Sequence, residues 1–238
     1  MLTAEAARLA ALEVLCPTAA LDADANYPTL ARHRVFDSRQ VGIDDLDADE
    51  KFTPCLALYT AEASTLPRGD AASWDDTEAR SVLEIVAELA VASTDEDGQP
   101  FADAMPGDDW DARLVLAALC AQVRRLLQHD PAGFLFRNFV RRIETIAEET
   151  FAIPQLGARW HRVTMRFTLS LPDDVYSDVS GLPAPISALA AILPAASPAR
   201  ARLATLANHF GAIARTPLAG IDVNTPESGQ GATAPTTE

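Results

Sequence analysis

The sequence is poor in cysteine and has no long apolar run. Its three cysteines, Cys16, Cys55 and Cys120, are far apart and form no CxxC pair. This spacing indicates neither a disulfide framework nor a zinc site, so we expect buried, reduced thiols. No segment approaches the roughly 18 to 20 apolar residues that a membrane helix needs, and Glu5 and Arg8 interrupt the alanine-rich start. The sequence therefore predicts a cytosolic chain without membrane contact.

Basic residues are also scarce. The 238 residues include 19 Lys and Arg against 34 Asp and Glu, which gives a formal charge of −15. This charge opposes binding to a phosphate backbone through a broad basic surface, so we expect no direct recognition of nucleic acid. Hydrophobic residues make up 48% of the chain, enough for one large domain or two small ones.

Catalytic and cofactor motifs are missing as well. The chain has no GxSxG, P-loop, dinucleotide fingerprint or HExxH. His33, His129, His161 and His209 lie far from one another and from the cysteines, so we expect surface or helix-capping positions and no metal or cofactor.

Acidic residues gather in and next to two segments expected to be loops, Ser64–Asp76 and Thr94–Asp109, and Trp74 and Trp110 lie beside some of them. The acids are Asp75, Asp76, Glu78, Asp95, Glu96, Asp97, Asp108, Asp109 and Asp111. Two of them brought together in an apolar cleft could act as general acid and base. Dense acidic loops more often face water, so we expect no catalytic residue.

The first half of the chain predicts one helix and two strands. A helix is expected over Thr3–Leu15 with Thr3 as its N-cap, and a strand covered on both faces over Pro54–Thr60. Ser81–Val91 favours a strand because it is rich in β-branched residues, although a helix with Glu84 and Glu88 on one face stays open. The other expected segments are an edge strand or extended arm at Arg32–Ser38 and loops at Gly42–Lys51, Ser64–Asp76 and Thr94–Asp109.

The second half begins with the clearest helix, Asp111–His129, which Asp108 or Asp109 caps and Asp130–Pro131 ends. Phe139, Ile143, Ile146 and Ala147 recur at helical spacing and predict a shorter helix. Trp160–Leu171 alternates and predicts a strand. Its apolar face holds Val163, Met165, Phe167, Leu169 and Leu171.

Together these elements predict an α+β fold, a small mixed β-sheet packed with helices, over residues 1–178. A Pro- and Ala-rich appended helical segment is expected over 179–224, with helices at Ile186–Leu193 and Pro198–Phe210. Residues 225–238 have the composition of a disordered tail.

A local basic strip lies on the polar face of the last strand. Arg162 and Arg166 are four residues apart, and Arg159 precedes them. Such a strip could meet acidic loops of a neighbouring copy, in a head-to-tail contact that closes into a ring. The alternative is a set of ordinary solvated charges.

The order of elements over Leu2–Leu171 resembles the tail-terminator subunits of bacteriophages. The shared order is an early helix, a strand like Pro54–Thr60, a second strand, a helix like Asp111–His129 and a closing strand like His161–Leu171. The resemblance implies a structural virion protein without an active site, whose hexameric ring caps the tail tube, stops its polymerisation and joins it to the head connector.

The implied partners are other copies of the chain, the tail tube protein and the head connector or neck protein. The implied location is the virion tail or neck, after assembly in the host cytoplasm. Two alternatives stay open: another neck or tail-completion subunit, and a small-molecule-binding domain or enzyme that uses the acidic loops.

Overall fold

The structure is a computed structural model that describes a large part of the chain. The described residues are 1–47, 49–69, 76–94, 97–106, 109–153, 158–177 and 179–211, of which 152, 153, 158 and 159 are described by backbone alone. The predicted tail from residue 225 and residues 212–224 of the predicted helical segment lie outside this set.

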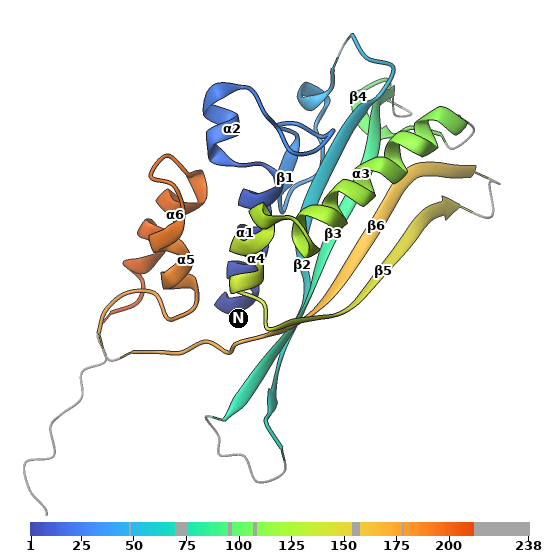
Figure 1. The fold of residues 1–238 in the computed structure, drawn as a ribbon. Coiled ribbons are helices and arrows are strands. Elements are labelled where there is room, and N and C mark those ends of the chain that lie inside the picture. The colour runs from blue at the N-terminus through green and yellow to red at the C-terminus, as the bar shows by residue number, and fades with distance from the viewer. Residues whose placement is uncertain are drawn as a thin grey trace, which may run out of the picture.

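A mixed sheet of six strands forms the centre of the molecule (Figure 1). The strands are β1 (Val35–Asp37), β2 (Thr53–Pro67), β3 (Thr77–Thr94), β4 (Pro100–Ala104), β5 (Arg142–Ile153) and β6 (Ala158–Leu171). Their order is β1-β2-β3-β6-β5, and β4 pairs with the end of β3. β1 runs parallel to β2, and the other pairs are antiparallel.

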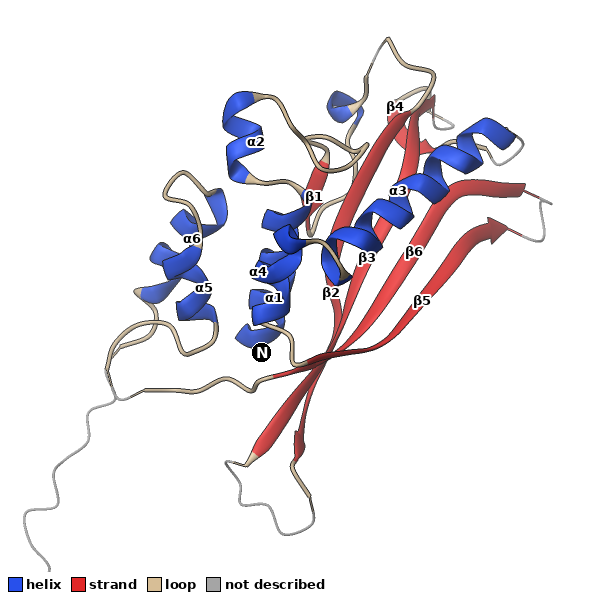
Figure 2. Cartoon of the chain, in the orientation of Figure 1, coloured by secondary structure: helices blue, strands red, loops and turns tan. Residues whose placement is uncertain are grey.

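Helices α1, α3 and α4 lie on one face of this sheet, and α5 and α6 lie beside α1 (Figures 1 and 2). The helices are α1 (Leu2–Leu15), α2 (Thr18–Ala23), α3 (Trp110–Gln128), α4 (Phe134–Asn138), α5 (Ile186–Ile192) and α6 (Pro198–Ala207). Short 3₁₀ turns occur at Ile43–Asp45 and Pro131–Gly133. The predicted α+β class is confirmed.

The alternation of β3 and β6 decides which side chains enter the main core. Ile85 pairs with Met165 and Leu83 with Phe167, and all four side chains are buried against the helices. Residues one position along point to the opposite face of the sheet, because side chains alternate along a strand. The apolar face predicted for the last strand is thereby confirmed.

Three predicted elements are confirmed with shifted ends. α3 matches the helix expected at Asp111–His129, and the Asp109 carboxylate caps it by accepting from the amides of Asp111 (2.9 Å) and Ala112 (3.2 Å). The strands expected at Pro54–Thr60 and Ser81–Val91 are parts of the longer β2 and β3. Ser64–Pro67, expected in a loop, belongs to β2, because pairing with β3 extends past the apolar segment.

The helix expected around Phe139–Ala147 is wrong, since β5 occupies most of it. A bulge between Ile143 and Thr145 inserts one extra residue into the pairing with β6. Ile143 therefore pairs with Leu169 and Ile146 with Phe167, so both isoleucines face the core although they are three residues apart. The bulge thus produces the spacing that a helix would give.

Two further expectations are corrected. The segment Thr94–Asp109, expected as a loop, contains β4, an edge strand that begins at Pro100, where the missing amide donor costs little. Thr3 does not cap α1, which begins one residue earlier, at Leu2. The distant carboxylate of Asp174 instead accepts from the amides of Leu2 (2.9 Å) and Thr3 (2.7 Å).

The two predicted C-terminal helices are confirmed as α5 and α6. Ile186, Leu189 and Leu193 are buried in the same core as the sheet and α1, and so is Leu203 of α6. The described part of this segment therefore packs on the α+β core. A domain division at residue 179 stays a prediction.

All three cysteines are free and buried. Burial raises the pKa of Cys16 to about 11 and those of Cys55 and Cys120 to about 12. These are the inert thiols expected from the sequence. No helix within the described residues is long and apolar enough to span a bilayer.

Phe167→Ala tests the core. Phe167 is fully buried, so truncation should lower the free energy of unfolding by about 3 to 5 kcal/mol, measured by urea denaturation. Phe134→Ala is the matched control, because that ring is 63% exposed and its loss should change stability by about 0.5 kcal/mol or less. Equal effects would contradict this packing.

The thiols provide a second test. At pH 8 the folded protein should react with almost no Ellman's reagent, because raised pKa values and burial keep the thiols protonated and covered. Unfolding in guanidinium should expose all three cysteines to rapid reaction. A fast-reacting thiol in the folded protein would show that one of them is accessible.

Candidate subunit interface

The outer face of the sheet, opposite α1 and α3, forms a trough of about 610 Å³. Its floor comes from the even-numbered residues of β3 and β6 and the odd-numbered residues of β2, which face away from the main core. β4, β5 and the segment before the first 3₁₀ turn supply the rim. The lining residues are Gln40, Val41, Ala57, Tyr59, Glu84, Val86, Glu88, Phe101, Ala102, Asp103, Phe151, Arg162 and Thr164.

Arg162 lies in the trough as one half of an ion pair. Strand register places it opposite Glu88, and its Nε donates to the Glu88 carboxylate at 2.6 Å. The Glu88 side chain is only 10% exposed, so the ion pair with Arg162 offsets the cost of burying it. Asp103 lies 3.9 Å from the same guanidinium, which also sits 5.5 Å from the centre of the Phe151 ring.

Arg166, four residues further along β6, is paired in the same way. It lies opposite Glu84, whose carboxylate is 3.3 Å away, and its Nη2 donates to Glu62 at 2.7 Å. Glu62 comes from β2, so this guanidinium links three adjacent strands. The Glu62 side chain is 68% exposed, so the Arg166–Glu62 pair is more solvated than the Arg162–Glu88 pair.

The structure thus places two of the three predicted interface residues on one face of the sheet. It also surrounds them with acids, so the face is not basic as the sequence predicted. Arg162 and Arg166 share one face, while Arg159 lies in β6 with its side chain outside the described set. Four acids, Glu62, Glu84, Glu88 and Asp103, surround the two guanidiniums, so the face carries an excess of negative charge. The interface role stays a prediction, but a neighbour would have to bring cations rather than acids.

Tyr59 adds a neutral polar group to the trough. Burial raises the pKa of its phenol, and the nearby Glu88 charge raises it further. The hydroxyl therefore stays protonated at neutral pH and can donate a hydrogen bond without adding charge.

In the described part of the acidic loops, two aspartates are held as carboxylates by neighbouring cations. Of the acids named from the sequence, Asp75, Asp95, Glu96 and Asp108 lie outside the described residues, as does Trp74. A hydrogen bond from Lys51 lowers the pKa of Asp109, and one from Arg39 lowers that of Asp45. A general acid at neutral pH needs a shift in the other direction. Trp110, expected beside a carboxylate, is 71% exposed.

The histidine expectation holds in part. His33, His129 and His209 are exposed, and His129 is the C-cap residue of α3. His161 is buried at 2% exposure, which corrects the surface position expected for it, because β6 turns its side chain inward beside α3. Among the described residues no group of His, Cys, Asp and Glu has the geometry of a metal site.

Sequence reasoning missed the outer face of α3. Trp110 and Leu114 are exposed at 71% and 61%, and the exposed Ala117, Ala121 and Arg125 continue the row at helical spacing. The helical period that assigns Leu116, Leu119 and Val123 to the core also assigns this row to solvent. That signal was available in the sequence.

Comparison with known proteins adds no relative: no protein family model matches the sequence, and no curated protein matches it either. Function must therefore be inferred from the surfaces described above.

Removing one guanidinium at a time tests the ion pairs. Arg162→Gln should lower the free energy of unfolding by about 2 kcal/mol, because it leaves the Glu88 carboxylate buried and unpaired. Arg166→Gln should cost less than about 1 kcal/mol, because Glu62 is largely solvated. Urea denaturation measures both values. The double change Arg162→Gln/Glu88→Gln should recover part of the lost free energy of unfolding. A double variant that is less stable than Arg162→Gln alone would contradict the pairing.

Proposed function

We propose that the protein is a ring-forming structural subunit of a phage tail, the terminator that caps the tail tube, stops its polymerisation and joins it to the head connector. The observation that carries the proposal is an arm formed by β2 and β3, which continue past the helices as a two-stranded ribbon (Figures 1 and 2). Beyond the last pair between β3 and β6, Ala79 with Leu171, the ribbon continues as Leu66 paired with Glu78 and Pro67 paired with Thr77, and we define the hairpin arm as residues 66–69 and 76–78. Residues 61–69 are all exposed.

A two-stranded ribbon is marginally stable on its own, so such an arm gains most when another chain packs on it. Its outer edge is also open: β1 pairs with β2 only from Leu56 to Leu58, and no other described strand pairs with the β2 edge from Tyr59 to Pro67. Leu66 adds a half-exposed apolar side chain near the end of the arm. The open strand edge and the exposed Leu66 support a chain whose arm is covered by a neighbouring subunit.

The order of elements supports the tail-terminator assignment in particular. α1, β2, β3, α3 and β6 follow one another as in the resemblance, with β4 and β5 in addition. The proposed partners are other copies of this chain, the tail tube protein and the head connector, in the tail or neck of the virion.

Salt should control the assembly of the free protein. Each copy carries −15, so approaching copies repel one another, and the Debye length falls from about 30 Å at 0.01 M salt to about 3 Å at 1 M. Light scattering should therefore show the 25.4 kDa monomer in low salt and a closed ring of several copies in high salt.

Magnesium chloride at matched ionic strength is the control, because screening alone gives the same curve for both salts. Addition of the ring to polymerising tail tubes should stop their elongation, which a neck subunit of another kind would not do. A chain that never associates and leaves tube growth unchanged would contradict the proposed function.

A further inference from the structure

We propose that the outer face of α3 in one copy docks into the outer trough of the next copy, so that each ring contact joins unlike surfaces. This inference rests on the proposed ring and names the contact that closes it. Here the α3 face means Trp110, Arg113, Leu114, Ala117, Ala121, Arg124 and Arg125.

The α3 face combines exposed apolar side chains with cations. Trp110 and Leu114 are one helical turn apart and are exposed at 71% and 61%. Ala117 and Ala121 continue the row and border a hollow of about 280 Å³ between α3 and the strands β5 and β6. Large exposed Trp and Leu side chains beside Arg have the composition of an interface centre, where Trp and Arg contribute most of the binding energy.

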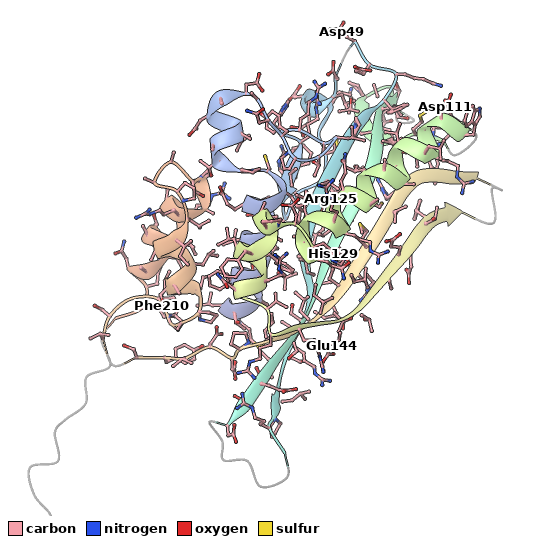
Figure 3. All side chains as sticks on the ribbon, viewed as in Figure 1. Asp49, Asp111, Arg125, His129, Glu144 and Phe210 are labelled. Carbon is pink, nitrogen blue, oxygen red and sulfur yellow. The ribbon has the colours of Figure 1, made fainter. Side chains whose placement is uncertain are left out.

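The arginines of this face are loosely held within their own chain. The Arg124 and Arg125 side chains are 52% and 76% exposed, and their nearest carboxylates, Glu148 and Asp130, are 3.7 Å away. Figure 3 labels Arg125 towards the C-terminal end of α3 and Asp111 at its N-terminal end. α3 therefore presents accessible positive charge on a protein whose formal charge is −15.

The trough has the complementary chemistry. Three acids line it, Glu84, Glu88 and Asp103, against the single cation Arg162, so it carries an excess of negative charge. Phe101 and Phe151 on the rim are exposed at 40% and 42% and can contact an incoming Trp or Leu. Ala57, Val86 and Thr164 on the floor are small enough to leave the hollow open. The negative charge of the trough is therefore complementary to the positive charge of the α3 face, and both surfaces expose apolar side chains.

Position explains why this match favours a ring. α3 packs on the β3 and β6 side chains of the core face, and the trough lies on the opposite face of the same strands. A copy cannot use its own α3 to fill its own trough. A contact between two different surfaces of identical chains is head-to-tail, and it closes into a ring when the rotation per subunit divides a full turn.

Charge reversal on each side provides the test. Variant A, Arg124→Glu/Arg125→Glu, makes the α3 face acidic, and variant B, Glu84→Lys/Asp103→Lys, makes the trough basic. Each variant alone should remain monomeric in salt where the wild type forms rings, with the dissociation constant raised at least about tenfold. An equimolar mixture should regain the ring mass by light scattering, because each acidic α3 meets a basic trough and each unchanged α3 meets an unchanged trough.

The matched control for variant A is Arg142→Glu/Arg202→Glu. Both side chains are at least 70% exposed and each has one acidic neighbour, so the change in charge is the same but lies outside the proposed contact. This control should form rings like the wild type. Circular dichroism and urea denaturation establish that every variant is folded.

A cross-link tests the contact without variant B. Chains with Leu114→Cys and chains with Thr164→Cys, mixed and treated with a short bismaleimide, should give a linked dimer, because the native thiols are buried. Chains with Leu21→Cys, at an exposed position on α2, should not link to Thr164→Cys.

The outcomes separate the two proposals. Wild-type rings together with rings of variant A, or no recovery on mixing folded A and B, would overturn the docking and leave the terminator function standing. A wild type that stays monomeric at every salt and concentration would overturn docking of a second copy. If that chain also left tube growth unchanged, the proposed function would fail too.

Discussion

The architecture depends on the covering of one face of the sheet by helices. Leu83, Ile85, Met165 and Phe167 are buried under α1 and α3, so this face supplies the hydrophobic stabilisation of the fold. On the other face the sheet carries a small second cluster of buried residues, Phe36, Cys55, Ala57 and Ala90. Beside this cluster Glu88 and Arg162 form a largely buried ion pair between β3 and β6, which adds little net stability. The result is an open, charged and concave face.

The elements that sequence alone predicted are those with an unbroken period. α3 keeps a helical stripe over nineteen residues and β6 keeps strict alternation, so both were found. β5 was misread because its bulge changes the spacing of Ile143 and Ile146. β4 was missed because a short edge strand beginning with proline has the composition of a loop. Caps from distant segments, such as Asp174 on α1, leave no local signal.

The candidate interface was predictable in location but not in charge. Arg162 and Arg166 share a face because side chains alternate along a strand, and this follows from their spacing. Their partners do not: Glu88 is 74 residues from Arg162, and Glu62 is 104 residues from Arg166. Only the pairing of β2, β3 and β6 turns an apparent basic strip into an acidic trough. The accessible cations are on α3 instead, and we propose that they meet this trough in the next copy.

Electron microscopy of the purified protein in about 0.5 M salt, where the net repulsion is screened, tests the central claim most directly. The proposed assembly predicts closed rings of uniform diameter, in which α3 of each copy lies against the outer sheet face of its neighbour. Single 25.4 kDa particles at every protein concentration, or rings whose copies leave both α3 and the trough open to solvent, would contradict it.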